Sequence, residues 1–131
     1  MSCHPSKKQS NIKVITDPTG AILRPLGFKA GAAYCGLKSD PECFDIGIIY
    51  SELPCITAAV FTNNKIVAAP IKFSRNILKN GTASAVIVNS GNANACTGDE
   101  GYKDTETMAK LTAGCLKIKP TEVLVASTGI I

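Results

Sequence analysis

The chain has 131 residues, of which 45% are hydrophobic and 18% are charged, and its net charge is +4 at pH 7. This composition predicts a globular domain with a real core and excludes an intrinsically disordered segment. The scattered positive charge forms no basic stripe with stacking aromatics, and no apolar run approaches the roughly 20 residues that cross a bilayer, so we expect neither nucleic acid nor membrane as a partner.

Residues 1–10 are polar and are expected to form a flexible tail, whereas residues 11–131 are expected to belong to one domain. A short strand is predicted at 12–15, and a turn follows at 17–20. The Gly- and Ala-rich stretch 27–38 predicts a strand with close backbone contacts.

Two strands and a helix are predicted in the middle of the chain. Residues 44–51 alternate in polarity and residues 55–62 are mostly apolar, and because turn residues separate them we expect a hairpin. Residues 70–80 predict a short helix after Ser74, which the Asn80–Gly81 turn ends.

The last third of the chain has the strongest local signals. Residues 83–89 (ASAVIVN) form a continuous apolar run, which is typical of a buried strand. Small polar residues at 90–97 predict a loop, and a helix is predicted over 101–116, opened by a capping box at 97–100. Residues 122–127 predict a final buried strand.

The predicted helix carries Met108, Leu111, Cys115 and Leu116 on one side, and we expect this side to face the core. Strand, loop, helix and strand over 83–127 make a βαβ unit, whereas the earlier half is more typical of antiparallel pairing. We therefore predict the α/β class, with an alpha+beta mixed sheet.

The six cysteines and the single histidine give no metal site by their spacing. The cysteines include no C-x-x-C pair, and His4 lies in the polar tail. Zinc sites need closely spaced pairs, so we predict no metal and no bound cofactor. The N-terminus lacks the apolar segment of a signal peptide, and we expect a cytoplasmic protein with reduced thiols.

One segment approaches a phosphate-binding loop without matching it. Gly31 and Gly36 have the glycine spacing of that motif, but Leu37 stands where the lysine belongs. We interpret these glycines as residues that allow tight backbone packing.

Two segments remain as candidate sites. Residues 89–98 (NSGNANACTG) leave a buried strand and enter a helix, where free backbone N–H groups gather, and the alternative is a loop whose Asn and Ser side chains brace its own turns. Ser127-Thr128-Gly129 ends the last strand. A hydroxyl and an adjacent N–H there suit a developing oxyanion, and the alternative is an ordinary strand-ending turn.

The order of several motifs resembles the N-terminal (alpha) part of the ornithine acetyltransferases, also called bifunctional glutamate N-acetyltransferases. The resemblance covers roughly residues 20–131, and residues 89–98 are its most specific part. The other matching segments are Gly27-Phe28-Lys29-Ala30, Gly36-Leu37-Lys38, Ala58 to Asn64, Ala68-Ala69-Pro70 and Ser127 to Ile131.

The resemblance implies an enzyme of arginine biosynthesis that moves an acetyl group from N-acetylornithine to glutamate through an acetyl-threonine, with acetyl-CoA as a substrate in some members. It implies a layered fold related to autoprocessing N-terminal-nucleophile enzymes. It also implies a self-cleaved precursor, whose beta chain carries the nucleophilic threonine, and a heterotetramer of two alpha and two beta chains. By the same resemblance, Thr128 and Gly129 form the oxyanion hole, while Asn92 and Asn94 are hypothesised to brace the loops.

The family's cleavage motif and nucleophile do not occur in residues 11–131, so this chain alone is expected to be inactive. A fragment of a related self-cleaving N-terminal-nucleophile hydrolase or aminopeptidase is one alternative. A non-catalytic interaction domain is the other.

Overall fold

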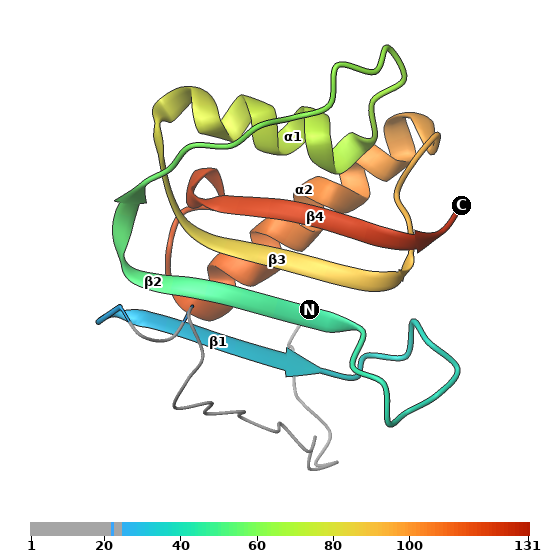
Figure 1. The fold of residues 1–131 in the computed structure, drawn as a ribbon, viewed down its shortest axis with the longest axis horizontal. Coiled ribbons are helices and arrows are strands. Elements are labelled where there is room, and N and C mark those ends of the chain that lie inside the picture. Colours follow the sequence, from blue (N-terminus) through green and yellow to red (C-terminus); the bar gives the residue numbers. More distant parts are fainter. Residues whose placement is uncertain (1–21, 23–24) are drawn as a thin grey trace.

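The computed structural model describes residue 22 and residues 25–131, and the features expected at 1–10, 12–15 and 17–20 lie outside the described residues. Four strands form one sheet in the order β1-β2-β3-β4 (Figure 1). The β1–β2 and β2–β3 pairs are antiparallel, and the β3–β4 pair is parallel. The predicted mixed sheet is therefore confirmed. The strands are β1 Phe28–Ala33, β2 Ile46–Ile56, β3 Thr82–Asn92 and β4 Val123–Ile130.

The predicted βαβ unit is also confirmed. β3 leads into α2 (Gly98–Leu116), and a short 3-10 turn, η3 (Pro120–Glu122), leads into β4. Because β3 and β4 are parallel, their carboxyl ends lie at the same edge of the sheet, beside the chain end marked C in Figure 1. This edge holds both candidate segments.

The core lies between the sheet and two helices. α2 packs against β3 and β4, while α1 (Ala69–Ile77), which is followed by η2 (Leu78–Asn80), packs against β4 and α2. Val123, Ala109 and Ala113 are at most 1% exposed, and Phe73 of α1 meets Tyr102 of α2 edge to face, with ring centroids 6.2 Å apart. Aromatic pairs prefer this arrangement.

α1 begins five residues before the predicted position at Ser74, so the expected start was wrong. Pro70 stands in the first turn of the helix, where its missing N–H costs nothing. The helix then buries Phe73 and Ile77, and Ser74 turns inward. The Ser74 hydroxyl donates to the carbonyl of Val125 at 2.9 Å and accepts from its N–H at 3.0 Å. α1 thereby covers part of the free edge of β4.

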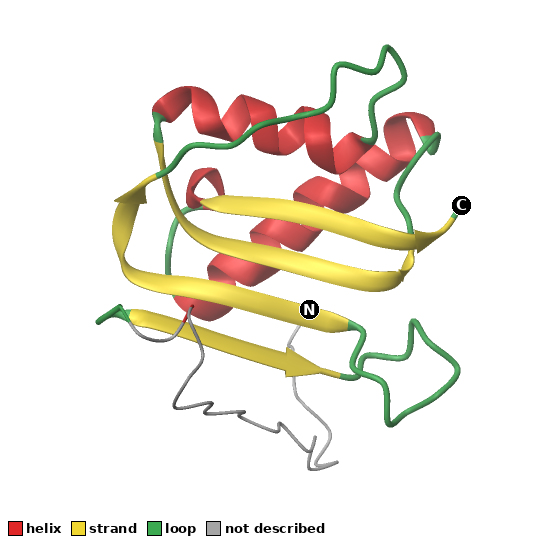
Figure 2. Ribbon diagram, in the orientation of Figure 1, coloured by secondary structure: helices red, strands yellow, loops and turns green. Residues whose placement is uncertain are grey.

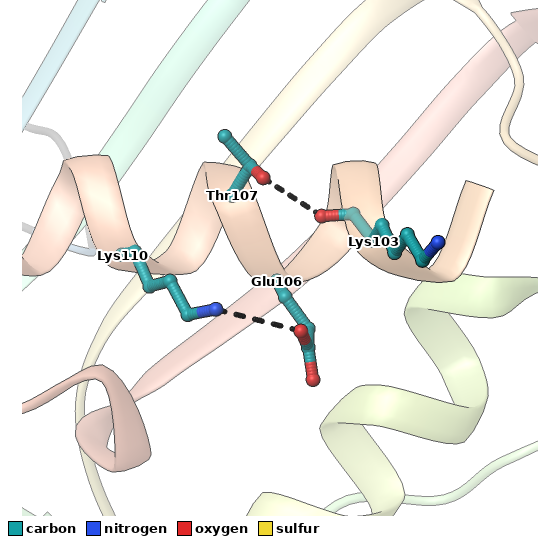
Figure 3. A network of polar contacts seen from close by, with 4 residues as sticks. All are labelled: Lys103, Glu106, Thr107 and Lys110. Atoms are coloured by element: carbon teal, nitrogen blue, oxygen red, sulfur yellow. Dashed lines mark hydrogen bonds and ion pairs between the residues drawn. The ribbon is translucent and has the colours of Figure 1, made fainter. Parts of the chain in front are cut away.

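α2 is present as predicted, but its buried side matches the predicted one only in part. Met108 and Leu116 are half-buried and pack against the core as expected. Leu111 is 66% exposed and Cys115 is also exposed, whereas the small residues Thr105, Ala109 and Ala113 are buried. Small side chains let the helix approach the sheet closely, and this tertiary requirement outweighs the apolar periodicity. The outer side carries polar residues, among them Glu106 and Lys110 (Figure 3).

The predicted hairpin of 44–51 with 55–62 is wrong, because β2 is a single strand. One strand runs from Ile46 to Ile56, and residues 57–68 form no strand. The register against β3 shifts between Tyr50 and Cys55, around Pro54. Proline has no N–H for a ladder, so a strand accommodates it at such an irregularity. β2 consequently pairs with β1 and β3 instead of folding back on itself.

The other face of the sheet is apolar and open. Ile46, Ile48 and Ile87 line a hollow against α2, so by the alternation of strand side chains Ile49 and Val88 point to the opposite face. A hollow of about 300 Å³ lies there over β1 and β2. Within the described residues, no helix or strand covers this face (Figure 2).

Candidate functional site

The fold brings the two candidate segments together at the carboxyl edge of β3 and β4. Ser90 is the register partner of Thr128, Gly91 of Gly129, and Asn92 of Ile130. The link continues past the ladder, since the N–H of Ala93 donates to the carbonyl of Ile130 at 3.0 Å. Sequence analysis identified each segment separately, and the parallel pairing makes them one site.

Thr128 and Gly129 lie within a strand, so the alternative of a strand-ending turn is wrong. β4 extends to Ile130, and Gly129 has a φ of 141°. A β-carbon at Gly129 would overlap the backbone of Gly91 and Asn92. The two strand ends therefore meet backbone to backbone, at a position that only glycine can occupy.

The N–H of Gly129 points away from β3. β4 is the last strand of the sheet, and both the N–H and the carbonyl of Val125 bond to Ser74 outside the ladder. Backbone groups of a strand alternate in direction, and the β3–β4 register is uninterrupted through Ile130, so Gly129 has the direction of Val125. Thr128 is exposed beside it. A hydroxyl and an N–H thus stand next to each other at an open edge, where they can donate to an anionic oxygen.

The hydroxyl of Ser127 is a feature that the sequence did not single out. Its oxygen is buried, and it has no hydrogen-bond partner among the described residues. Buried polar atoms are nearly always paired, so this hydroxyl differs from most buried polar groups. Ser127 stands immediately before Thr128, which adds a third polar group to this strand end.

The segment 89–98 braces itself through its asparagines. The loop predicted at 90–97 is shorter than expected, because β3 runs to Asn92. The amide of Asn89 donates to the carbonyl of Asn92 at 2.7 Å. The amide of Asn94 donates to the carbonyl of Gly101 at 2.6 Å and to the hydroxyl of Thr105 at 3.0 Å. The bracing expected of Asn94 is therefore present, and it ties the loop to the first turns of α2.

The predicted capping box is wrong. Thr97 occupies the N-cap position of α2, but its side chain makes no cap hydrogen bond to the helix. Its hydroxyl instead donates to the side-chain oxygen of Asn94. The competing partner comes from the braced loop, and a sequence pattern at 97–100 does not include it.

Asp45 is the second feature that sequence reasoning missed. Its carboxylate accepts the backbone N–H groups of four successive residues, and Asp45 is 1% exposed. Burial acts to raise the pKa of Asp45, but the N–H groups of the loop and the Cys35 side chain outweigh it and hold that pKa well below its usual range. The one available signal was a lone Asp inside an apolar run. The four donors are Cys35, Gly36, Leu37 and Lys38.

This carboxylate also explains the near-match to a phosphate-binding loop. Gly31 lies in β1, and the N–H groups after it converge on Asp45 instead of facing solvent. The interpretation of tight backbone packing is wrong, because a β-carbon at Gly36 would meet nothing within 4 Å and one at Gly31 would make only an ordinary contact, 3.9 Å from Ile48. Gly36 instead has a φ of 94°, which favours glycine.

Within the part of the chain that the structure describes, no three His, Cys, Asp or Glu side chains gather as a metal site would require. The five described cysteines are free thiols. No helix among these residues is long and apolar enough to span a membrane.

Comparison with known proteins identifies a family. The sequence pattern of the ArgJ family matches residues 29–131. The arginine biosynthesis bifunctional protein ArgJ of Dehalococcoides mccartyi is 46% identical over 124 residues, which are 94% of this chain and 30% of that protein. The chain thus spans about a third of the length of this curated relative.

Two solved structures share the fold. The crystal structure of the arginine biosynthesis bifunctional protein ArgJ of Bacillus halodurans matches with a TM-score of 0.82 and 38% identity, over 95% of this chain and 63% of that one. The ornithine acetyltransferase of Mycobacterium tuberculosis, solved with ornithine, matches with a TM-score of 0.78 and 38% identity, over 84% of this chain and 60% of that one.

Proposed function

The chain belongs to the ArgJ family, and we propose that it forms part of an acetyltransferase that moves the acetyl group of N-acetylornithine to glutamate in arginine biosynthesis. The ornithine held by the structurally similar Mycobacterium tuberculosis enzyme supports this class of substrate. Acetyl-CoA is a second acetyl donor in this proposal, and the reaction takes place in the cytoplasm.

The donor pair at the end of β4 carries the proposal. Thr128 is exposed, and the adjacent N–H of Gly129 points away from β3, so both groups can donate to the same oxygen. Preorganised donors of this kind stabilise the negative charge that a carbonyl oxygen gains when a nucleophile attacks it. Thr128 and Gly129 are therefore assigned to the oxyanion hole.

The chemistry requires a nucleophile from the rest of the enzyme. A threonine at the start of the beta chain, freed by self-cleavage of a precursor, attacks the acetyl carbon, and its own α-amine takes the hydroxyl proton. The carbonyl electrons move to the oxygen held by Thr128 and Gly129. Collapse breaks the C–N bond, and the α-ammonium gives its proton to the departing nitrogen of ornithine. The amine of glutamate then attacks the acetyl-threonine ester and loses a proton to the α-amine. Collapse of this second intermediate breaks the C–O bond, the proton passes to the threonine oxygen, and acetylglutamate leaves.

The open face of the sheet supports a partner for this chain. Ile49, Val86 and Val88 lie there half-buried, with no described helix or strand above them. Contiguous apolar surface of this kind marks an interaction site. In the proposed enzyme the beta chain covers it, and two alpha–beta pairs form a heterotetramer.

The test uses this chain joined to the remaining part of the Dehalococcoides mccartyi relative. We expect acetyl transfer from N-acetylornithine to glutamate, and we expect Thr128→Ala to lower kcat by about 100- to 1000-fold, the usual effect of losing one oxyanion donor. Thr107→Ala, on the outer side of α2, is the matched control and should leave kcat unchanged.

Other results would redirect the proposal. Normal turnover by Thr128→Ala would remove Thr128 from the oxyanion hole. Release of acetate to water without acetylglutamate would favour the hydrolase alternative. A folded, assembled protein without any turnover would favour the interaction domain.

A further inference from the structure

The carboxylate of Asp45 accepts hydrogen bonds from four backbone N–H groups. Its Oδ1 accepts the N–H of Cys35 at 2.6 Å, and its Oδ2 accepts those of Gly36, Leu37 and Lys38 at 3.1, 2.7 and 3.1 Å. The ion pairs of the described residues, Lys29–Glu52 and Lys110–Glu106, do not involve it. Backbone dipoles, together with the Cys35 side chain, therefore hold its charge, and in return the carboxylate fixes the path of this loop.

The backbone of Asp45 joins this loop to the strands on either side. Its N–H donates to the carbonyl of Ala33 at the end of β1, at 3.0 Å. Its carbonyl accepts the N–H of Ser90, near the carboxyl end of β3, at 2.8 Å. The ammonium of Lys38 closes the loop by donating to the carbonyl of Phe44 at 3.0 Å.

The fixed loop lies directly against Gly91. A β-carbon on Gly91 would stand 3.1 Å from Cγ of Lys38 and 3.4 Å from the carbonyl group of Leu37. On its other side Gly91 meets Gly129, whose β-carbon would overlap the Gly91 backbone. Three segments are thus stacked closely, from the loop at 35–38, with its Leu37 carbonyl and the stem of Lys38, through Gly91 to Gly129.

We propose that Asp45 is a positioning residue for the oxyanion hole, which it sets by fixing the 35–38 loop as the support of Gly91 and hence of Gly129. The inference rests on the proposed function, because it needs Gly129 to hold the reacting oxygen. Asp45 touches no reacting atom. It acts through the backbone and the Lys38 stem of the loop and through the backbone of Gly91, which are packed so closely that a displacement of the loop is passed on to Gly129.

The test variant is Asp45→Asn in this chain joined to the remaining part of the Dehalococcoides mccartyi relative. An amide has nearly the shape of the carboxylate but replaces one acceptor with an NH₂ donor, which opposes the N–H groups of the loop. We expect kcat to fall by about 10- to 100-fold, the scale for small displacements of catalytic groups. KM for N-acetylornithine and glutamate should stay within about twofold, because ground-state binding does not use the oxyanion hole.

The control is Asp40→Asn in the neighbouring turn, where an exposed carboxylate accepts one N–H, that of Glu42, at 2.9 Å. It should leave kcat and KM unchanged. Rates are referred to the amount of enzyme that can be acetylated after long incubation, so unfolded protein does not lower kcat.

Each outcome decides one point. Wild-type kcat in Asp45→Asn, or a raised KM with unchanged kcat, would overturn the positioning role while the measured wild-type activity upheld the proposed function. A wild-type protein without acetyl transfer would overturn the proposed function itself. If Asp45→Asn does not fold, Lys38→Ala decides, because it removes the stem beside Gly91 at an accessible loop: a lower kcat with unchanged KM supports the role, and an unchanged kcat overturns it.

Discussion

Two groups of polar atoms lie near the carboxyl edge of the sheet and use their hydrogen bonds in opposite ways. In the bracing cluster, defined as Asp45 with the loop 35–38 and Asn94 with Gly101 and Thr105, donors and acceptors are matched inside the chain. At the donor edge, defined as Ser127, Thr128 and Gly129, a buried hydroxyl, an exposed threonine and an outward N–H remain available.

The difference between these groups separates scaffold from site. A fully satisfied polar network rigidifies the backbone that it connects. Donors that have no partner within the fold can hydrogen-bond to a negatively charged oxygen of a bound molecule without rearrangement. The bracing cluster therefore holds the edge in place, and the donor edge is where the chemistry is proposed.

The largest expected effect comes from breaking the donor edge itself, with Gly129→Ala. A φ of 141° strains any residue with a β-carbon, and that carbon would overlap Gly91, so we expect a loss of about 1–3 kcal/mol of stability and at least about 100-fold in kcat. Thermal unfolding and steady-state kinetics measure the two effects. Gly114→Ala, in open space on α2, should stabilise by about 0.4–1 kcal/mol, and an equal response of the two variants would refute the special role of Gly129.

Asn94→Ala tests the bracing cluster, with the next largest effect. It removes the amide that donates to the carbonyl of Gly101 and to the hydroxyl of Thr105, although that hydroxyl still donates to the same carbonyl. We therefore expect the loss of a typical hydrogen bond, about 0.5–1.5 kcal/mol. Denaturant unfolding measures the change. Asn64→Ala, in an exposed loop, serves as control and should stay within about 0.5 kcal/mol; a similar loss there would contradict the distinction.

Acid should weaken the bracing cluster through Asp45. Because its pKa is lowered in the folded state, the unfolded state binds the proton more readily, so the stabilisation is complete above the ordinary carboxyl pKa of about 4 and is lost as the pH falls below it. The difference in Tm between the wild type and Asp45→Asn should be constant from about pH 8 to about pH 5 and should narrow below about pH 4. A difference that does not narrow in acid would show that the charge of Asp45 is not what holds the loop.

The smallest effect is expected away from both groups. Lys110 and Glu106 form an ion pair of 3.5 Å one turn apart on α2, and both are well exposed (Figure 3). Lys110→Ala should cost no more than about 0.5 kcal/mol, and about 1 M salt should remove the effect. Lys103→Ala on the same helix, which makes no ion pair among the described residues, is the control. A loss of stability in Lys110→Ala as large as that in Asn94→Ala would contradict the distinction between the bracing cluster and the exposed surface.

Local patterns predicted much of the fold. The apolar run at 83–89 and the helix at 101–116 lie within β3 and α2, and the strand predicted at 122–127 lies in β4 from Val123 on. Each has enough consecutive residues of one kind to specify itself. The strand at 55–62 was wrong, and the inward side of α2 was right for Met108 and Leu116 but not for Leu111 and Cys115. The register shift between Tyr50 and Cys55 and the close approach of α2 depend on neighbours far along the chain.

The sequence by itself determined the βαβ unit and the motifs at 89–98 and 127–131 that carry the family resemblance, because those are properties of consecutive residues. Only the tertiary structure decided which polar groups have hydrogen-bond partners within the chain and which can bind another molecule. Ser74 reaches Val125 across 51 positions, and Gly129 has an outward N–H because β4 is the last strand of the sheet. Hydrogen-bond partners are chosen in space, and no local pattern records that choice.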